Sequence, residues 1–248
     1  MNLILLMPDE IQAEGLAVLA GKRARHVREV LKTMPGGEIR VGVVDGPPGT
    51  AVVEENGDEI RLRCSLAREV PPSPRVDLLL AMPRPKVMNR LWPVLASLGV
   101  GRIAVCKAWK TERNYLDTHV LEPSHIRAGL IEGLQQARDT RLPRVSVHRQ
   151  FRKLVEDELD GLGPWSARLT AHPGAERFPF TTLASLPAGG RVLLAVGPEG
   201  GWTPFELDLL AAHGFRPVSW GERVLRTDTA CAVLLGLVHA GLAASAGG

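Results

Sequence analysis

The feature of this sequence that most constrains its fold is the alternation of short apolar runs with helical patterns after residue 75. Apolar runs bounded by turn residues predict buried strands, and they occur in "RVDLLLAMP", "RIAVCKAW", "SARLTAHP", "RVLLAVGP" and "FRPVSWG". Helical patterns lie between them, in "RLWPVLASLGV", "PSHIRAGLIEGLQQARDT", "TPFELDLLAAHG" and the apolar C-terminal run. Strands that alternate with helices predict an α/β fold whose parallel sheet is covered on both faces.

The segment before residue 75 has a different pattern. The stretches "GEIRVGVVDG", "GTAVVEE" and "DEIRLRCSLAREV" predict short strands joined by turns, with one helix around "GKRARHVREVLKT". The prolines of "REVPPSPRV" predict a stiff, extended linker. We therefore expect two domains, a small β-barrel over residues 1–70 and an α/β domain over residues 75–248.

Cysteine and apolar content exclude several classes of protein. Cys64, Cys106 and Cys231 are far apart and form no C-x-x-C pair, and the histidines show no metal-ligand spacing. This argues against a disulfide framework and against a metal site. The start "MNLILLMPDE" has no basic region before its short apolar stretch, so it predicts a strand and not a signal peptide. The longest apolar run is interrupted by His239 and glycines, which favours a buried helix over a membrane span and indicates a cytoplasmic protein.

The charge of the chain is unevenly distributed. The formal net charge is only +3, yet residues 75–153 carry a large excess of lysine and arginine over acids. A second basic group lies in "GKRARHVREVLK". Basic residues gathered in one part of a protein suggest phosphate contacts, whereas a solvated helix face is the alternative. A linear count does not choose between the two.

A glycine-rich loop lies between a predicted strand and a predicted helix in "VLLAVGPEGGWTPFE". Val192–Val196 predicts a buried strand, and Thr203, Pro204 and Glu206 give an N-cap, a proline at the first helical position and a capping-box acid. Backbone N–H groups are accessible to a ligand in such a loop. The loop is neither G-x-G-x-x-G nor a P-loop, so a tight turn without a ligand is the alternative.

A second unusual loop is "WGERVLRTDTA". Gly221 follows a predicted strand, Arg223 and Arg226 are three apart, and residues 227–229 are expected to cap the apolar terminal helix. Arg226 either meets a ligand or only caps and pairs. Ligands bind at the carboxyl ends of strands in open α/β sheets. The two loops together predict a pocket made of backbone beside an arginine.

The motifs in these loops resemble those of a known family. "VGPEGGWTPFELDLLAAHGFRPVSWGERVLRTDTA", "ARHVREVLKTMPGGEIRVGVVDG" and "EGLQQARDTRLPRV" are similar to segments of the RsmE family, and "TAHP" lies where that family has a first cofactor loop. These enzymes, within the SPOUT superfamily, make 3-methyluridine in 16S ribosomal RNA. The resemblance implies a PUA-like N-terminal domain, a trefoil-knotted SPOUT methyltransferase domain and a homodimer.

The resemblance also implies a cofactor, S-adenosyl-L-methionine, bound in the knot by three loops. Gly197, Gly200 and Gly201 would leave room for its nucleoside against bare backbone. The implied cofactor-binding residues are Thr170, Ala171, His172, Pro173, Gly197, Pro198, Glu199, Gly200, Gly201, Trp220, Gly221, Val224, Leu225, Arg226, Thr227 and Thr229.

The implied reaction transfers a methyl group to N3 of a uridine in the small ribosomal subunit, with no metal. Arg226 is expected to stabilise the uridine anion, and the base is Glu199, Asp228 or bulk water reached through Thr229; Glu199 alternatively only braces its loop. The expected RNA-binding residues are Lys22, Arg23, Arg25, Arg28, Arg84, Lys86, Arg90, Arg138 and Arg141.

The sequence departs from the family pattern in one helix. Residues 92–99 read "WPVLASLG", without the acid and lysine of the family's Glu-Lys-x-Thr-Glu-Leu-Gly helix end, and Pro93 is expected in the first helical turn. The target nucleotide, and whether naked RNA or the assembled subunit is methylated, therefore stay open. A SPOUT enzyme for another RNA such as transfer RNA, and a non-catalytic RNA-binding or ribosome assembly factor, are the alternatives.

Overall fold

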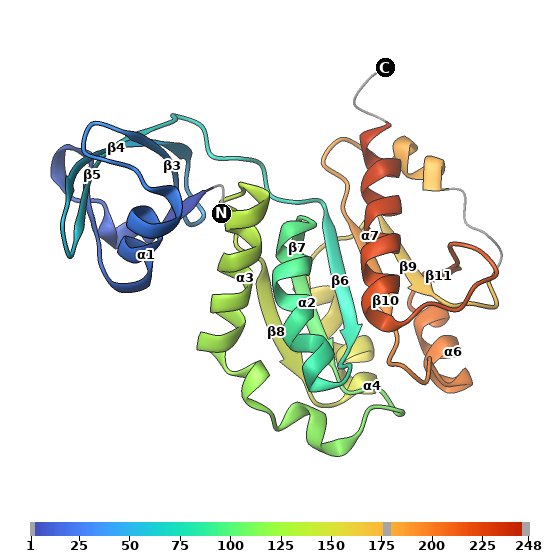
Figure 1. The fold of residues 1–248 in the computed structure, drawn as a ribbon. Coiled ribbons are helices and arrows are strands. Elements are labelled where there is room, and N and C mark those ends of the chain that lie inside the picture. Colours follow the sequence, from blue (N-terminus) through green and yellow to red (C-terminus); the bar gives the residue numbers. More distant parts are fainter. Residues whose placement is uncertain (1–2, 176–179, 245–248) are drawn as a thin grey trace. The chain divides into compact units, whose positions relative to one another are not determined.

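The computed structural model describes residues 3–175 and 180–244, and the chain forms two compact units (Figure 1). The first, here the β unit, contains residues 1–73 and 131–142; the second, here the α/β unit, contains residues 74–130 and 143–248. Residues 131–142 thus belong with the N-terminal strands, although residues 74–130 of the other unit precede them in the chain.

The α/β unit is built on a six-stranded sheet in which every pairing is parallel, as predicted. The strand order is β11-β9-β10-β6-β7-β8. The strands are β6 (Val76–Ala81), β7 (Val100–Cys106), β8 (Arg144–His148), β9 (Ala167–Ala171), β10 (Val192–Val196) and β11 (Phe215–Val218). β10 lies between β6 and β9, with Leu194 beside both Leu78 and Leu169. All residues of β6 and β10 are buried, which explains their continuous apolar runs.

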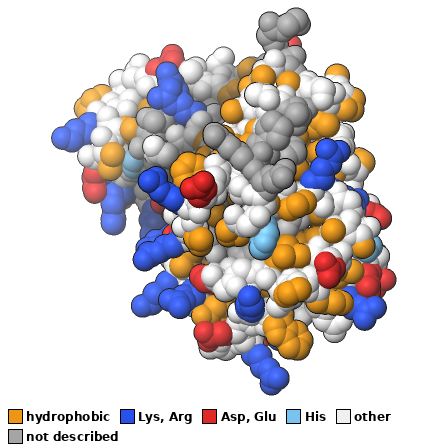
Figure 2. All heavy atoms as spheres, turned by 90° about the vertical axis from the view of Figure 1, so that its right-hand side faces the viewer, with side chains coloured by type: hydrophobic (Ala, Val, Ile, Leu, Met, Phe, Trp, Pro, Cys, Tyr) orange, Lys and Arg blue, Asp and Glu red, His pale blue; other side chains and the backbone are white. Residues whose placement is uncertain are grey.

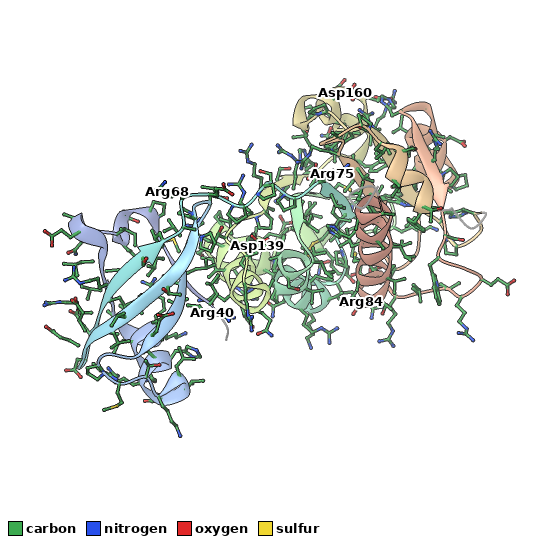
Figure 3. All side chains as sticks on the ribbon, turned by 90° about the horizontal axis from the view of Figure 1, so that it is seen from above. Arg40, Arg68, Arg75, Arg84, Asp139 and Asp160 are labelled. Carbon is green, nitrogen blue, oxygen red and sulfur yellow. The ribbon has the colours of Figure 1, made fainter. Side chains whose placement is uncertain are left out.

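Helices cover both faces of this sheet. α2 (Pro85–Ser97) and α7 (Thr227–Ala243) contact each other and the strands on one face. On the other face Leu79 and Leu193 pack with Phe151, Leu154 and Leu210. These residues come from α4 (Phe151–Lys153), the π-helical turn η6 (Leu154–Glu158) and α6 (Pro204–Ala212), and α5 (Leu159–Leu162) continues this layer. Figure 3 shows Arg84 and Asp160 on opposite sides of the sheet.

The remaining elements of the α/β unit are short, apart from α3 (Pro123–Ala137), whose residues from Ile131 onward are grouped with the β unit. They are η4 (Arg113–Leu116), η5 (His119–Leu121) and η7 (Phe180–Ser185). Figure 2 shows hydrophobic side chains on the face that carries α6 and α7, with Lys and Arg side chains mostly toward its margin.

Two details of the predicted helices were wrong. α2 begins at Pro85, so Pro93 lies inside the helix and not in its first turn. A proline there removes one backbone hydrogen bond of the helix. α7 begins at Thr227 with Arg226 at the N-cap, and no side chain caps it. The Thr227 hydroxyl donates instead to the carbonyl oxygen of Gly197, at 3.4 Å.

The β unit contains one five-stranded sheet in the order β1-β3-β4-β5-β2. Its elements are β1 (Ile4–Leu6), η1 (Pro8–Glu10), η2 (Ala13–Gly15), β2 (Leu16–Leu19), α1 (Gly21–Arg25), the π-helical η3 (His26–Leu31), β3 (Glu38–Val43), β4 (Pro48–Asn56) and β5 (Ile60–Leu66). β1 pairs parallel to β3 and the other pairs are antiparallel. The sheet curls around a core that includes Leu6, Val41 and Leu62 (Figure 1). The predicted small β-barrel is thus a curled half-barrel, with β1 and β2 at its two edges.

Residues 131–142 are fastened to the turn after β3. Thr140 is fully buried; its hydroxyl donates to the Gly46 carbonyl oxygen at 2.6 Å, and its own carbonyl oxygen accepts from the Asp45 backbone N–H at 2.7 Å. The Asp45 carboxylate accepts from the backbone N–H of Leu142 at 3.1 Å. This contact explains why the segment belongs to the β unit.

None of the helices within residues 3–175 and 180–244 is long and apolar enough to cross a membrane.

His239, on α7, should make the stability of the protein depend on pH. Burial lowers its pKa, against a smaller opposing effect of a hydrogen bond with the Leu98 backbone. Below about pH 6.5 the unfolded chain therefore binds a proton that the folded chain binds less readily, so stability falls as the pH is lowered. We expect a smaller fall in the melting temperature between about pH 7.5 and about pH 5.5 for His239→Asn than for the unmodified chain. His119→Asn, at an exposed position, is the control, and its melting temperature should fall as much as that of the unmodified chain.

Candidate functional site

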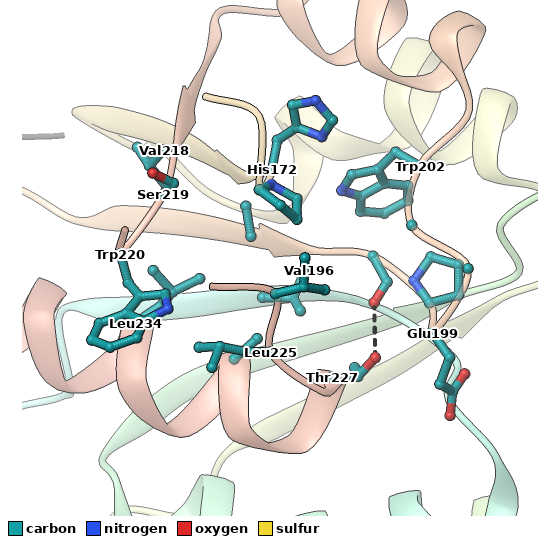
Figure 4. Close-up of a pocket in the computed structure, with 18 of the residues that line it drawn as sticks. His172, Val196, Glu199, Trp202, Val218, Ser219, Trp220, Leu225, Thr227 and Leu234 are labelled. Atoms are coloured by element: carbon teal, nitrogen blue, oxygen red, sulfur yellow. Dashed lines mark hydrogen bonds between the residues drawn. The ribbon is translucent and has the colours of Figure 1, made fainter. Parts of the chain in front are cut away.

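A pocket of about 410 Å³ lies at the carboxyl ends of β9, β10 and β11 (Figure 4). Its walls come from the loops that follow these strands, from the start of α7 and from Lys110 beyond β7. The lining residues are Lys110, Ala171, His172, Pro173, Val196, Gly197, Pro198, Glu199, Gly200, Gly201, Trp202, Val218, Ser219, Trp220, Gly221, Arg223, Val224, Leu225, Thr227, Ala230 and Leu234. The loops after β10 and β11 thus meet, as the sequence predicted.

The loop after β10 has a backbone conformation and close contacts that require glycine. Gly201 has φ of +68°, and a Cβ added there would meet no atom within 4 Å. At Gly197 a Cβ would lie 3.2 Å from the Trp202 ring, and at Gly200 it would lie 2.9 Å from Lys110 Cδ. Gly201 therefore fits the expectation of open space against bare backbone, whereas neighbouring side chains fill that space at Gly197 and Gly200.

Helix α6 fixes the far end of this loop. The Thr203 hydroxyl accepts a hydrogen bond from the Glu206 backbone N–H, and the Glu206 carboxylate accepts one from the Thr203 N–H at 2.8 Å. Pro204 is the first helical residue. The predicted N-cap, first-turn proline and capping box are all confirmed.

Three hydrogen bonds fasten the loop to its surroundings. The backbone N–H of Arg84 donates to Glu199 at 3.0 Å, and Lys110 Nζ donates to the Gly200 carbonyl oxygen at 2.7 Å. The third is the bond from Thr227 to Gly197, drawn in Figure 4. In that view the Glu199 carboxylate points away from His172, Val196 and Leu225. This geometry favours the bracing role of Glu199 over the role of a base.

Most of the expected cofactor-binding residues line the pocket, and three do not. Thr170 is buried at the end of β9, whereas Arg226, the N-cap of α7, and Thr229, in its first turn, are exposed. The lining also contains residues that were not expected, namely Lys110, Val196, Trp202, Val218, Ser219, Arg223, Ala230 and Leu234. Lys110 had a usable signal in the sequence, because it follows closely on a predicted strand of the same parallel sheet.

Arg226 and Asp228 do not line the pocket but are chain neighbours of residues that do, a position here called the rim of the pocket. Arg226 sits between Leu225 and Thr227, which both line the pocket, and its own side chain is exposed. Asp228 accepts a hydrogen bond from the Thr229 backbone N–H at 2.9 Å and lies 3.7 Å from Arg90. An acid in the first turn of α7 is also favoured by the helix dipole.

Three of the expected RNA-binding residues lie at the start of α2 beside these loops. Arg84, Lys86 and Arg90 are all exposed. Arg84 is tied by its backbone to Glu199, and Arg90 pairs with Asp228. Positive charge therefore lies next to two loops of the pocket.

The other expected RNA-binding residues belong to the β unit, and several have partners within it. Arg23 pairs with Glu10, which lowers the pKa of that carboxyl, and Arg28 donates to the Asp58 carbonyl oxygen at 3.1 Å. Arg25 lies 3.8 Å from Glu29 and Arg141 donates to the Asp45 carbonyl oxygen at 3.3 Å. Exposed residues in this group are Lys22, Arg25 and Arg138.

The described residues offer no evident site for a metal ion. They contain no cluster of three or more His, Cys, Asp or Glu side chains that could hold a metal ion. Burial raises the pKa of the Cys106 thiol well above its usual range and that of Cys231 to about 12. Both thiols stay protonated at neutral pH and are poor nucleophiles and ligands.

The pocket offers both apolar walls and polar groups to a nucleoside cofactor. Val196, Leu225 and Leu234 give it apolar walls, and its loops present backbone groups. Its volume falls in the range of small-molecule sites. Trp202 Nε1 is buried without a hydrogen-bond partner among the described residues, so the site has spare polar capacity. The expected S-adenosylmethionine is compatible with this set of residues.

Comparisons with known proteins agree with the geometry. Residues 71–239 match the family described as RNA methyltransferase domain. The ribosomal RNA small subunit methyltransferase E of Treponema pallidum is 32% identical, over 97% of this chain and 92% of that protein. This chain belongs to that methyltransferase E family. The Mycobacterium bovis member is 30% identical, over 90% of this chain and 86% of its own length.

Solved structures of this kind share the fold. The methyltransferase E of Neisseria gonorrhoeae, crystallised with S-adenosyl methionine, superposes with a TM-score of 0.76 and is 20% identical, with 97% of each chain covered. A methyltransferase from Legionella pneumophila, also with that cofactor, has a TM-score of 0.73 and 24% identity, with 96% of this chain and 97% of that one covered. At this level of identity the two structures establish the fold of the methyltransferase E family for this chain.

Proposed function

We propose that this protein methylates N3 of a uridine in 16S ribosomal RNA, with S-adenosylmethionine as methyl donor. The observation that carries the proposal is the pocket at the carboxyl ends of β9, β10 and β11, in a chain that belongs to the methyltransferase E family. S-adenosylmethionine supplies the electrophilic methyl group when it is bound. The residues of the chain must then hold the cofactor, orient the uridine and assist the loss of its N3 proton.

The pocket residues divide these tasks. Val196, Leu225 and Leu234 supply apolar contact for the nucleoside, and the backbone of residues 197–201 supplies hydrogen bonds. Arg226, exposed at the rim, donates to the oxygens that flank N3 as negative charge develops on the uridine. Glu199 holds its loop to Arg84, which leaves Asp228 or bulk water near Thr229 to take the proton.

The two units have different roles in this proposal. The α/β unit is a SPOUT domain that carries a trefoil knot and binds the cofactor. The position of β10 between β6 and β9 in the sheet supports this assignment. The β unit is a PUA-like domain that binds RNA through Lys22, Arg25 and Arg138, which are exposed. The protein acts as a homodimer in the cytoplasm, where the small subunit is assembled. Gly236 and Ala240 on α7 are exposed and leave a close-packing face for the second copy.

Methyl transfer from radiolabelled S-adenosylmethionine separates this function from its alternatives. Purified small subunits, naked 16S ribosomal RNA and transfer RNA serve as substrates in parallel. The proposal expects label in the small subunit or its RNA. Label in transfer RNA would favour the other SPOUT activity. Cofactor binding with no transfer to any RNA would favour the assembly factor.

A further inference from the structure

A second hollow, here the aromatic groove, lies in the α/β unit beside the start of α6. It measures about 780 Å³, and its lining residues are Lys107, Ala108, Trp109, Thr111, Arg113, Arg149, Gln150, Phe151, Arg152, Thr203, Pro204, Phe205 and Glu206. Trp109 is 84% exposed and Phe205 is 57% exposed, and both line it. Large aromatic side chains seldom lie this open to water unless they meet a partner.

The groove is also basic. Lys107, Arg113, Arg149 and Arg152 line it. Arg149 pairs with Asp117 at 2.7 Å and Arg152 with Glu156 at 2.8 Å, whereas no ion pair is recorded for Lys107 or Arg113 within the described part of the chain. Two cations therefore remain for a ligand.

The one acid that lines the groove does not oppose an anionic ligand. Glu206 is only 3% exposed. Its carboxylate accepts hydrogen bonds from the backbone N–H groups of Trp109, at 2.7 Å, and of Thr203, at 2.8 Å. These bonds satisfy its charge and fasten the loop that carries Trp109 to the start of α6, which carries Phe205. The aromatic side chains thus stand on a rigid base.

The groove adjoins the cofactor pocket. Lys110 and Trp202 line the pocket, while their chain neighbours Trp109 and Thr203 line the groove. The Trp202 ring also packs on Phe151 of the groove, with ring centroids 5.3 Å apart. A strand that places one nucleotide at the cofactor can therefore run on over Trp109.

We propose that the aromatic groove binds single-stranded RNA next to the target uridine, with bases stacked on Trp109 and Phe205 and phosphates held by Lys107 and Arg113. The inference rests on the proposed function and adds a substrate subsite to it. Aromatic faces combined with cations are the usual means by which proteins hold unpaired strands. Because N3 of a paired uridine is hidden, the target must be unpaired, and its neighbours then offer free faces for stacking.

The test measures binding of a short single-stranded oligoribonucleotide in the presence of S-adenosylmethionine. Trp109→Ala should weaken binding by about tenfold, as expected for loss of one stacked base, while Trp109→Phe should retain most of it. Phe205→Ala should also weaken binding. Stacking should quench tryptophan fluorescence in the unmodified chain, and the quenching should disappear in Trp109→Ala.

A charge-matched pair of variants tests the phosphate contacts. Arg113→Ala should weaken binding and reduce its dependence on salt, because one phosphate contact is lost. Arg216→Ala, which removes the same charge from an exposed site on β11 outside the groove, should leave binding unchanged. Cofactor affinity should stay the same in all these variants.

Two outcomes would overturn the proposal. One is unchanged binding of the oligoribonucleotide by both Trp109→Ala and Phe205→Ala. The other is weaker binding of these variants to assembled small subunits while their binding of the oligoribonucleotide is unchanged. That result would assign the groove to a protein partner. Failure of the proposed function is distinguishable, because it would leave the unmodified chain unable to transfer a methyl group whether or not the groove binds RNA.

Discussion

Arg226→Lys should lower the single-turnover rate of methyl transfer to small subunits on the order of a hundredfold, with cofactor affinity unchanged. Arg226 is exposed between two residues that line the pocket, so it is placed to meet a substrate at the rim. A planar guanidinium can donate two parallel hydrogen bonds to the uridine anion, and an ammonium cannot match that geometry. Because the variant keeps the positive charge, a lower rate would reflect the loss of the guanidinium's hydrogen-bond geometry.

Arg223 is the matched control, because it is the other arginine of the loop and lines the pocket. Arg223→Lys should keep most of the turnover. A normal rate in Arg226→Lys together with a large loss in Arg223→Lys would contradict the assignment and move the role to Arg223. A collapse of cofactor affinity in Arg226→Lys would make that residue part of the cofactor site instead.

Gly201→Val should lower the affinity for S-adenosylmethionine by about tenfold or more, roughly 1.4 kcal/mol, as measured by calorimetry. Gly201 has φ of +68°, a conformation that a β-branched residue rarely adopts. The substitution would therefore shift the loop backbone, and it would place a side chain in space that is open beside the pocket.

Gly214→Val separates this local effect from a general loss of stability. Gly214 has φ of +80°, also has no atom within 4 Å of an added Cβ, and follows α6 outside the lining of the pocket. Both variants should be destabilised, by about 1–2 kcal/mol from the backbone strain. Equal cofactor affinity in the two variants would show that the loop after β10 does not bind the cofactor.

The sequence predicted those parts of the fold that depend on local pattern. Val192–Val196 is a continuous apolar run because β10 is buried on both faces. The residues "TPFE" predicted the start of α6 because they contain its N-cap, its first-turn proline and its capping-box acid. The loops after β10 and β11 meet because parallel strands place their carboxyl ends at one edge of the sheet. These inferences needed no knowledge of distant contacts.

Features that depend on tertiary contacts were not predictable in this way. β8 is an edge strand with largely exposed or half-buried residues, so its sequence lacks the apolar run that marks the central strands. Residues 131–142 join the β unit through the hydrogen bonds of Thr140 and Asp45, which no local pattern records. Helix α2 starts earlier than its apolar run because Pro85 can occupy a first helical turn.

Around the pocket, too, local motifs predicted some residues, and tertiary contacts determined others. The glycines and the apolar residues could be assigned from motifs, whereas Lys110 reaches the Gly200 carbonyl oxygen from a loop ninety residues earlier in the chain. Glu199 was ambiguous in the sequence, and its hydrogen bond from the Arg84 backbone favours a bracing role. Side-chain direction, which residue type and spacing do not specify, accounts for these differences.

The central claim is that the pocket at the ends of β9, β10 and β11 delivers a methyl group to uridine N3. Its most direct test is mass spectrometry of nucleosides from small-subunit RNA treated with the protein and S-adenosylmethionine carrying a deuterated methyl group. We expect 3-methyluridine that carries the deuterated group, formed by the unmodified chain and strongly reduced with Gly201→Val. A deuterated methyl group on any other nucleoside or position, or none in the RNA while the cofactor binds, would contradict the claim.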